Sequence, residues 1–248
     1  MSIWSELPVM IVSFSGIDGA GKSTQISALE TWLNGCGLRT ALLTFWDNVV
    51  CFSASREFMS LKAFKGDAGV GSPEKPLQRR DKNVSSWPVT AMRFGLYFAD
   101  AVNLCIRVRQ SRKTGADVVI FDRYIYDELA NLPLDRKPIA IFARLILKLV
   151  PRPDLALVID ADPVAAHARK PEYPLEFVRR NRESYLRLVK LSGTMTVIEP
   201  DSVEAMKTNI SSKMLKTLEQ KRLHLAERHS AVSLPNPANI SPGELIEP

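Results

Sequence analysis

The chain has 248 residues, of which 46% are hydrophobic, and a formal net charge of +6. That composition is typical of a globular protein with a substantial core, and the basic balance suits an anionic partner such as a nucleotide. No apolar run is long enough for a membrane span, and three scattered cysteines and three histidines argue against a disulfide framework and a zinc centre. We therefore expect a cytoplasmic protein without a membrane span.

The first half of the sequence alternates between strand and helix patterns. Residues 9–14 form an apolar, β-branched run directly before glycines, which indicates a buried parallel strand. A helix is predicted at 24–33, where apolar side chains recur at helical spacing and glycines follow. A second strand is predicted at 40–46, then an irregular segment that ends at residue 88, and then a long, mostly apolar helix at 89–108.

The second half continues this alternation. Its predicted elements are strands at 117–121, 154–160 and 194–198 and helices at 139–150, 174–191 and 203–225. Strands separated by helices indicate an α/β fold with a doubly wound parallel sheet of five strands flanked by helices. We expect one domain over residues 1–226. The proline-rich residues 227–248 predict a flexible C-terminal tail.

A glycine-rich motif lies between the first strand and the first helix. Residues 16–24 read GIDGAGKST and fit the pattern G-x-x-x-x-G-K-[ST], in which glycines let backbone N–H groups turn towards a phosphate. Lys22 supplies a charge to the β- and γ-phosphates, and Ser23 offers a hydroxyl to Mg²⁺. The residues predicted to bind ATP-Mg²⁺ are Gly16, Asp18, Gly19, Ala20, Gly21, Lys22, Ser23 and Thr24. The strand and helix on either side favour this interpretation over a glycine-rich turn without a ligand.

The third predicted strand ends in the sequence FDRY, at residues 121–124. An aspartate at the carboxyl end of a strand beside the phosphate loop can hold the shell of Mg²⁺, which gives Asp122 a metal-binding role. Arg123 can then face an incoming anion; the alternative for both residues is an ion pair at the solvated end of the strand. Neither the N-K-x-D guanine signature nor the acidic strand end of remodelling ATPases occurs. These observations favour a phosphotransferase.

With these two motifs the chain resembles the thymidylate kinase family of nucleoside monophosphate kinases over roughly residues 9–215. The segments that carry the resemblance are GIDGAGKSTQ (16–25), FDRYIYDELA (121–130), LALVIDADPVAAHAR (155–169) and LEFVRRNRESYLRL (175–188). The resemblance implies a P-loop kinase fold with a short lid at residues 163–182 and an acceptor-binding region at residues 47–115. It also implies ATP and Mg²⁺ as cofactors.

The resemblance further implies roles for single residues. Asp18 would line the acceptor site, and Arg123 would bind the acceptor phosphate. Arg169 would approach the donor phosphates from the lid with the help of Arg180 or Arg182; the alternative for these arginines is a solvated position on the outside of a helix. The catalytic residues predicted in this way are Lys22, Arg123 and Arg169.

Two positions depart from the family pattern. In thymidylate kinases the second strand is followed by a motif with an arginine that grips the acceptor phosphate, whereas the stretch here, Phe45 to Asn48, contains none. In the long helix Tyr97 stands where an aromatic side chain stacks on thymine, but Ala101 replaces the arginine expected four residues later. The arginines that could substitute are Arg93, Arg79 and Arg80. The acceptor-binding residues predicted are therefore Asp18, Tyr97, Arg93 and Arg123.

The sequence thus predicts an ATP-dependent phosphotransferase that transfers the γ-phosphate to a nucleoside monophosphate, with dTMP as the best single acceptor. A kinase of the same fold that acts on another small molecule is the nearest alternative, and a nucleotide-binding regulatory protein without turnover is a second one. We expect no stable association with nucleic acid. The apolar helix predicted at 139–150 could form a homodimer interface or belong to the core; the alternative is a helix that lies on a membrane surface.

Overall fold

The computed structural model describes residues 8–51 and 87–232 of the chain. Within these residues five strands form one sheet in the order β2-β3-β1-β4-β5, and all neighbouring strands are parallel. The strands are β1 (Met10–Ser15), β2 (Thr40–Thr44), β3 (Val118–Asp122), β4 (Leu155–Ile159) and β5 (Met195–Ile198). The predicted α/β fold with a parallel five-stranded sheet is confirmed.

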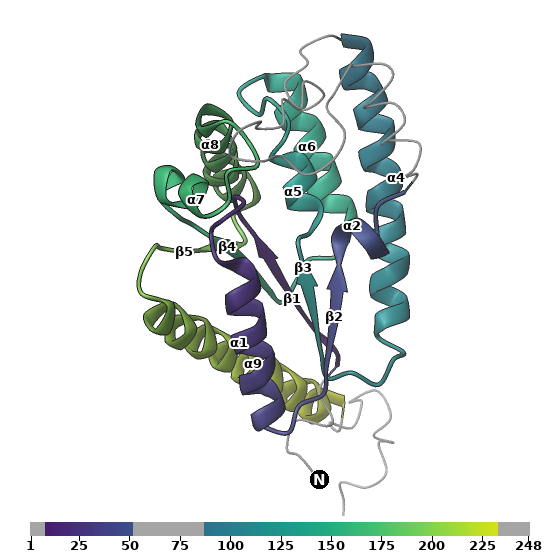
Figure 1. Cartoon of the computed structure of the whole chain (residues 1–248). Helices are drawn as coiled ribbons and strands as arrows, with labels where there is room; N and C mark the ends of the chain where they lie inside the picture. Colours follow the sequence, from purple (N-terminus) through teal and green to yellow (C-terminus); the bar gives the residue numbers. More distant parts are fainter. Residues whose placement is uncertain (1–7, 52–86, 233–248) are drawn as a thin grey trace, which may run out of the picture.

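Helices cover both faces of this sheet (Figure 1). They are α1 (Lys22–Gly35), α2 (Phe45–Asn48), α4 (Trp87–Ser111), α5 (Ile125–Leu129), α6 (Lys137–Leu149), α7 (Pro163–Arg169), α8 (Leu175–Ser192) and α9 (Val203–Val232). α1 packs against α9, whereas α4 packs against α5 and α6, and α8 contacts α5, α6 and α7. Among the described helices, none combines the length and the apolar character that a membrane span requires.

The structure corrects the predicted end of the second strand. β2 ends at Thr44, and the chain then turns into α2 instead of extending the strand to Trp46. The side chain of Asn48 accepts a hydrogen bond from the backbone N–H of Thr44 at 2.8 Å, and Phe45 is fully buried. Because a nearby side-chain acceptor competes with strand pairing for backbone donors, this aromatic stretch forms a helical turn despite its strand propensity.

The structure also adds two elements and lengthens another. The short helices α5 and α7 have no counterpart among the predicted elements. α9 continues to Val232, beyond its predicted end near residue 225, and so includes the start of the predicted tail. The rest of that tail, residues 233–248, lies outside the described residues, as do Arg79 and Arg80 of the predicted acceptor-binding region.

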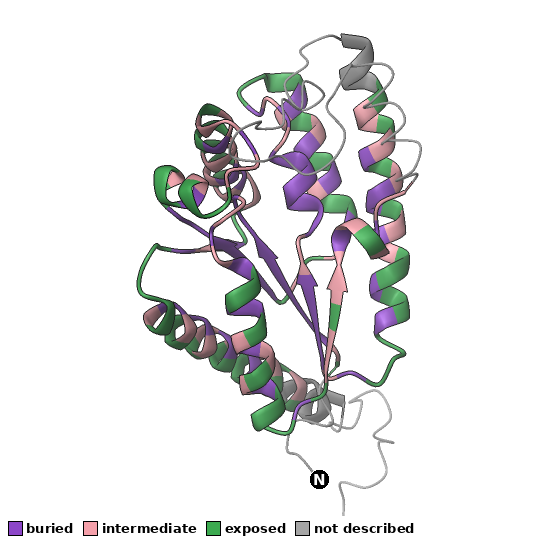
Figure 2. Ribbon diagram, in the orientation of Figure 1, coloured by how far each residue is buried: buried purple, intermediate pink, exposed green. Residues whose placement is uncertain are grey.

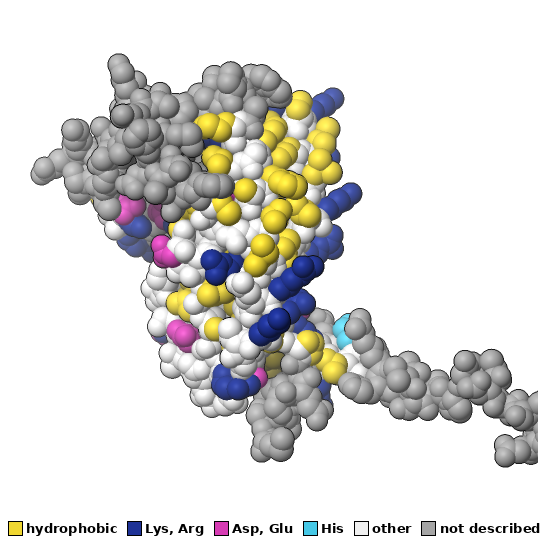
Figure 3. All heavy atoms as spheres, turned by 90° about the vertical axis from the view of Figure 1, so that its right-hand side faces the viewer, with side chains coloured by type: hydrophobic (Ala, Val, Ile, Leu, Met, Phe, Trp, Pro, Cys, Tyr) yellow, Lys and Arg dark blue, Asp and Glu magenta, His cyan; other side chains and the backbone are white. Residues whose placement is uncertain are grey.

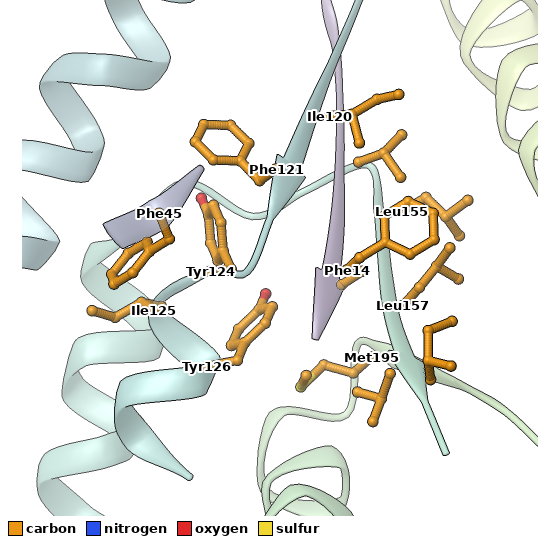
Figure 4. Close-up of a cluster of buried hydrophobic side chains, with 14 of the residues drawn as sticks. Phe14, Phe45, Ile120, Phe121, Tyr124, Ile125, Tyr126, Leu155, Leu157 and Met195 are labelled. Carbon is orange, nitrogen blue, oxygen red and sulfur yellow. The ribbon is translucent and has the colours of Figure 1, made fainter. Parts of the chain in front are cut away.

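The core lies on both faces of the three central strands. β1, β3 and β4 consist almost entirely of buried residues (Figure 2). Successive side chains of a strand alternate between faces, and Figure 4 shows Ile120 and Phe121 pointing to opposite sides of β3. Phe121 meets Tyr124 edge to face, with ring centroids 5.4 Å apart. This packing fixes the carboxyl end of β3, where the FDRY sequence turns away from the sheet.

The carboxyl ends of the parallel strands meet at one edge of the sheet. In the register of the sheet Phe14 lies opposite Asp122, and Ser15 lies opposite Val158. β1 stands between β3 and β4, so the two motifs singled out from the sequence leave the sheet on neighbouring strands. In open α/β sheets ligands bind at such an edge, where the strand order reverses.

Candidate phosphate-transfer site

The phosphate loop is held in place by close backbone contacts. It runs from Gly16 to Gly21, between β1 and α1, and Gly21 caps α1 with a left-handed backbone. Gly16 and Gly19 also have positive φ angles, of 136° and 81°. A Cβ atom on Gly16 would collide with the carbonyl of Ile159, and one on Gly19 would collide with the carbonyl of Ala166. The loop therefore needs glycine at both positions, and it packs directly against the end of β4 and against α7.

Lys22 is the first residue of α1, and its side chain is only 7% exposed. Its ammonium donates hydrogen bonds to the carbonyls of Gly16 and Ile17, both at 2.8 Å. Burial lowers the pKa of Lys22 to about 8; the charge of Arg123 adds to this effect, and the charge of Asp18 opposes it. The lysine predicted to bind phosphate is thus already inside the loop, where an arriving anion would favour its charged form.

Arg123 follows β3 directly and has an unusual backbone. Its φ of 69° is the only positive φ of a non-glycine residue in the described part of the chain, and its N–H donates to the carbonyl of Phe14 at 2.9 Å. Its guanidinium contacts the carboxylates of Asp18 and Asp127. Burial acts to lower the pKa of Arg123, but these two carboxylates outweigh it and hold the pKa above its ordinary value. Arg123 is therefore a permanent cation beside the phosphate loop.

Asp18 connects the two cations. Its carboxylate contacts Arg123 and lies 4.0 Å from the ammonium of Lys22. Burial acts to raise the pKa of Asp18, but Arg123 and Lys22 together hold the pKa below its ordinary value. The side chain remains 20% exposed, so an incoming molecule can reach it. The role of Asp18 at the acceptor site stays a prediction, which this position between the cations suits.

Asp127, in the first turn of α5, is a candidate that sequence reasoning missed. Its side chain is 1% exposed and accepts hydrogen bonds from the Ser15 hydroxyl, the Arg123 guanidinium, the Tyr124 N–H and the Tyr185 hydroxyl. The available signal is an acidic residue one helical turn after FDRY. That signal is weak, because two of the four partners lie far away along the chain.

The predicted magnesium ligands occupy suitable places. Asp122 is the half-buried last residue of β3, and Ser23 and Thr24 are exposed at the start of α1. In the described ranges no group of three or more His, Cys, Asp or Glu side chains could hold a metal ion. One hydroxyl and one carboxylate still fit Mg²⁺, which commonly takes its remaining ligands from phosphate oxygens and water. Ser23 and Asp122 therefore stay the predicted ligands.

The three arginines predicted for the lid differ in their contacts. Arg169 ends α7 with an exposed side chain, as a lid arginine requires. Arg182 instead donates two hydrogen bonds of 2.6 Å to Asp160 at the end of β4. Arg180 pairs with Glu176 on the surface at 3.1 Å. These contacts favour Arg169 as the arginine that approaches a ligand and give Arg182 a structural role.

The positions of α4 that were compared with the family's acceptor contacts lie mainly on the inward side of this helix. Tyr97 is buried, Ala101 has no exposed surface, and Arg93 is half-buried. Asn48 uses its side-chain oxygen to close the turn after β2. The two positions where the family pattern has arginines are thus occupied by a turn-closing amide and a core alanine. Acceptor binding by Tyr97 and Arg93 stays a prediction.

Two relatives decide to which family the chain belongs. A probable thymidylate kinase from Methanosphaera stadtmanae is 25% identical over 215 residues, which cover 84% of this chain and 99% of the relative. A probable thymidylate kinase from Pyrobaculum aerophilum is 32% identical over 187 residues, which cover 71% of this chain and 80% of the relative. The chain belongs to the thymidylate kinase family.

A solved thymidylate kinase shares the fold. The crystal structure of the enzyme from Ehrlichia chaffeensis matches with a TM-score of 0.52 at 17% sequence identity, and the match covers 83% of this chain and 98% of the other. No family model matches the chain. The membership in the thymidylate kinase family that the phosphate loop and FDRY predicted is confirmed by the relatives.

Proposed function

We propose that this member of the thymidylate kinase family transfers the γ-phosphate of ATP to dTMP. The observation that carries the proposal is the placement of Lys22 in the phosphate loop and Arg123 beside it, joined through Asp18. One cation can hold the phosphate that is transferred while the other holds the phosphate of the acceptor. The names of the relatives support dTMP as that acceptor.

In the proposed reaction an oxygen of the acceptor phosphate attacks the γ-phosphorus while the bond to the β,γ-bridging oxygen breaks, and ADP leaves. Loop N–H groups and Lys22 stabilise charge on the donor phosphates, and Arg123 orients the acceptor. Bound Mg²⁺, for which Ser23 and Asp122 are the available ligands, supplies further charge neutralisation. Arg169 approaches from the lid. Positioning and electrostatic stabilisation are sufficient for this chemistry, so no covalent enzyme intermediate is needed.

ATP and Mg²⁺ as cofactors and a cytoplasmic location belong to the same proposal. All three cysteines are free thiols, which suits a reducing compartment. The exposed hydroxyl of Ser23 and the half-buried carboxylate of Asp122 are hard oxygen ligands of the kind that Mg²⁺ prefers.

The decisive experiment measures ADP release by the full chain with ATP and Mg²⁺ and a panel of nucleoside monophosphates, nucleosides and sugar phosphates. We expect dTMP to stimulate ADP release and to yield dTDP, identified by mass spectrometry. The Lys22→Ala variant serves as the control for contaminating kinases, since it should lack transfer. Stimulation by non-nucleotide acceptors alone would refute dTMP as the substrate.

A second candidate is a kinase of the same fold with another small acceptor. The observation that favours it is the loss of both expected arginines, because Asn48 closes a turn and Ala101 lies in the core. A missing charge-assisted hydrogen bond to substrate weakens recognition by about one to two decades. The same panel separates the two candidates. Tight ATP binding without product from any acceptor would instead indicate a regulatory nucleotide-binding protein.

We further propose that two copies associate through an apolar face on α4 and α6. These helices pack on each other through the stacked rings of Phe94 and Phe142, whose centroids are 3.9 Å apart. Their outer sides expose Phe98, Val102, Ile106, Ile141, Leu145 and Leu149. Figure 3 shows hydrophobic side chains gathered on this face, with lysines and arginines along its edge. A contiguous exposed apolar surface of this kind is typical of an interaction site.

Light scattering during size-exclusion chromatography tests this association. Leu145 on α6 and Leu223 on α9 are both 60% exposed, so they form a matched pair. We expect a dimer for the wild-type chain and for Leu223→Arg, and a monomer for Leu145→Arg. A wild-type chain that stays monomeric at micromolar concentration would rule out the proposed interface.

A further inference from the structure

Arg123 is held between two carboxylates that differ in accessibility. Its Nη1 donates to Asp127 at 3.0 Å, and its Nη2 contacts Asp18. The side chain of Asp127 is 1% exposed, whereas that of Asp18 is 20% exposed and belongs to the phosphate loop. A ligand can therefore reach the Asp18 side of the guanidinium, while the Asp127 side is closed to it.

Asp127 has its full set of hydrogen-bond partners. Its Oδ2 accepts from the Ser15 hydroxyl at 2.7 Å and from the Tyr124 N–H at 3.1 Å. Its Oδ1 accepts from Arg123 at 3.0 Å and from the Tyr185 hydroxyl at 2.7 Å. A carboxylate offers about four lone-pair sites, so none is left over. Bonds from β1, from the turn after β3 and from α8 thus fix this carboxylate, and the carboxylate fixes the guanidinium.

The backbone of Arg123 explains why its side chain needs such a fixed partner. A left-handed conformation is strained for a residue other than glycine, because its Cβ approaches the following carbonyl oxygen. The N–H bond to Phe14 and the side-chain bond to Asp127 oppose relaxation to an ordinary φ. Without the bond to Asp127, only Asp18 would hold the guanidinium, on the side that a ligand can reach.

We infer that Asp127 is the positioning residue that directs Arg123 at the acceptor phosphate, and that Tyr185 connects this orientation to α8. The inference rests on the phosphotransfer proposed above. Nη1 stays bonded to Asp127 throughout the reaction, and acceptor oxygens bind on the Nη2 side, where Asp18 lies in the present structure. α8 begins within the predicted lid region, residues 163–182, so the contact between Tyr185 and Asp127 joins the lid to the orientation of Arg123.

Kinetics of the full-length Asp127→Asn enzyme test the inference. The amide keeps the shape of the side chain but turns one acceptor oxygen into a donor that faces other donors. We expect the KM for dTMP to rise by about tenfold or more, the loss typical of a hydrogen bond to a charged group, while the KM for ATP changes less than about twofold. Tyr185→Phe removes one bond only and should have a smaller effect of the same kind. Asp135→Asn, at a 62% exposed carboxylate, is the matched control and should change neither KM.

A double-mutant cycle distinguishes positioning from a merely structural role. If Asp127 acts through Arg123, then Asp127→Asn should add almost nothing to the KM for dTMP in an Arg123→Ala enzyme. Equal effects in both backgrounds, or equal effects on ATP and dTMP, would overturn the inference. Should Asp127→Asn fail to fold, Tyr185→Phe carries the same cycle. If the wild-type enzyme is active and the effects of the two substitutions add, the inference alone is refuted. If the wild-type enzyme phosphorylates no nucleoside monophosphate, the proposed function and the inference are both refuted.

Discussion

The burial of Lys22 among the carbonyls of its own loop should make ATP binding depend on pH. Burial lowers the pKa of Lys22 from an ordinary 10.5 to about 8, and a bound polyphosphate favours the charged ammonium. Above pH 8 binding therefore requires uptake of a proton. We expect the ATP affinity to be constant from pH 7 to about 8 and then to fall by up to tenfold per pH unit, as measured by calorimetry. An affinity that stays level to pH 9.5 would contradict this.

The lowered pKa of Lys22 should also make stability depend on pH, but in the opposite direction to ATP binding. Because the unfolded lysine binds its proton more tightly than the folded one, burial of Lys22 opposes folding fully below pH 8. That cost disappears as the pH rises from about 8 towards 10.5. In the Lys22→Met variant both pH dependences should be absent.

Lys22 should act on the donor ATP, and Arg123 should act on the acceptor dTMP. Lys22→Ala should abolish transfer while leaving the fold intact, because the lysine serves the donor phosphates. Arg123→Ala should raise the KM for dTMP by ten- to a hundredfold, the range typical of a lost bond between charged groups, with ATP binding nearly unchanged. Steady-state kinetics and ATP calorimetry check both variants. Equal weakening of ATP and dTMP by Arg123→Ala would show that the division is wrong.

At the level of elements, the contact between the phosphate loop and α7 predicts that substitution by alanine has different effects at two glycines. Gly19 and Gly37 have similar positive φ angles, 81° and 76°, but only Gly19 lies against a backbone carbonyl, that of Ala166. Gly37→Ala should cost about 1–2 kcal/mol of unfolding free energy through its backbone alone. Gly19→Ala should cost more and weaken ATP binding, because the loop must leave α7. Urea unfolding and calorimetry compare them, and equal costs would argue against the contact.

The predicted strands agree with the structure to within about two residues, because short, β-branched apolar runs bounded by turn residues are typical of strands in a parallel sheet. The short helices α5 and α7 escaped prediction because they contain too few turns to show helical periodicity. Phe45 and Trp46 were wrongly predicted to continue the strand, because the deciding contact is a single hydrogen bond that the Asn48 side chain accepts. Pattern arguments thus find elements that are stabilised by repetition and miss those that depend on one contact.

In the candidate site, too, local motifs could be predicted and single long-range contacts could not. The phosphate loop could be predicted because its glycines and lysine are adjacent in sequence and each has a local reason. Asp127 could not, since its importance comes from Ser15 and Tyr185, which lie 112 and 58 residues away along the chain. The family pattern led to Ala101 as a point of comparison, but only the structure showed that it belongs to the core.

For the whole molecule, we expect contacts at the amino end of the sheet to affect stability, and contacts at its carboxyl end to affect phosphate transfer. At the amino end Asp154 accepts hydrogen bonds from the Ile11 N–H and the Lys221 ammonium, both at 2.8 Å, and so ties α9 to β1. Asp154→Ala should lower the free energy of unfolding by about 1 kcal/mol, since the pair is partly exposed, without changing kcat. Urea unfolding and kinetics measure the two effects. A fall in kcat for the folded variant would show that the two ends are coupled.

The contact of Gly19 with α7 also limits how the lid can move. The carbonyl of Ala166 leaves no room for a side chain on Gly19, and Ala166 lies one turn before Arg169. α7, the first helix of the lid, is therefore held against the phosphate loop close to Arg169. Arg169 should meet a triphosphate by rotation about its own side-chain bonds, without any swing of the helix that carries it.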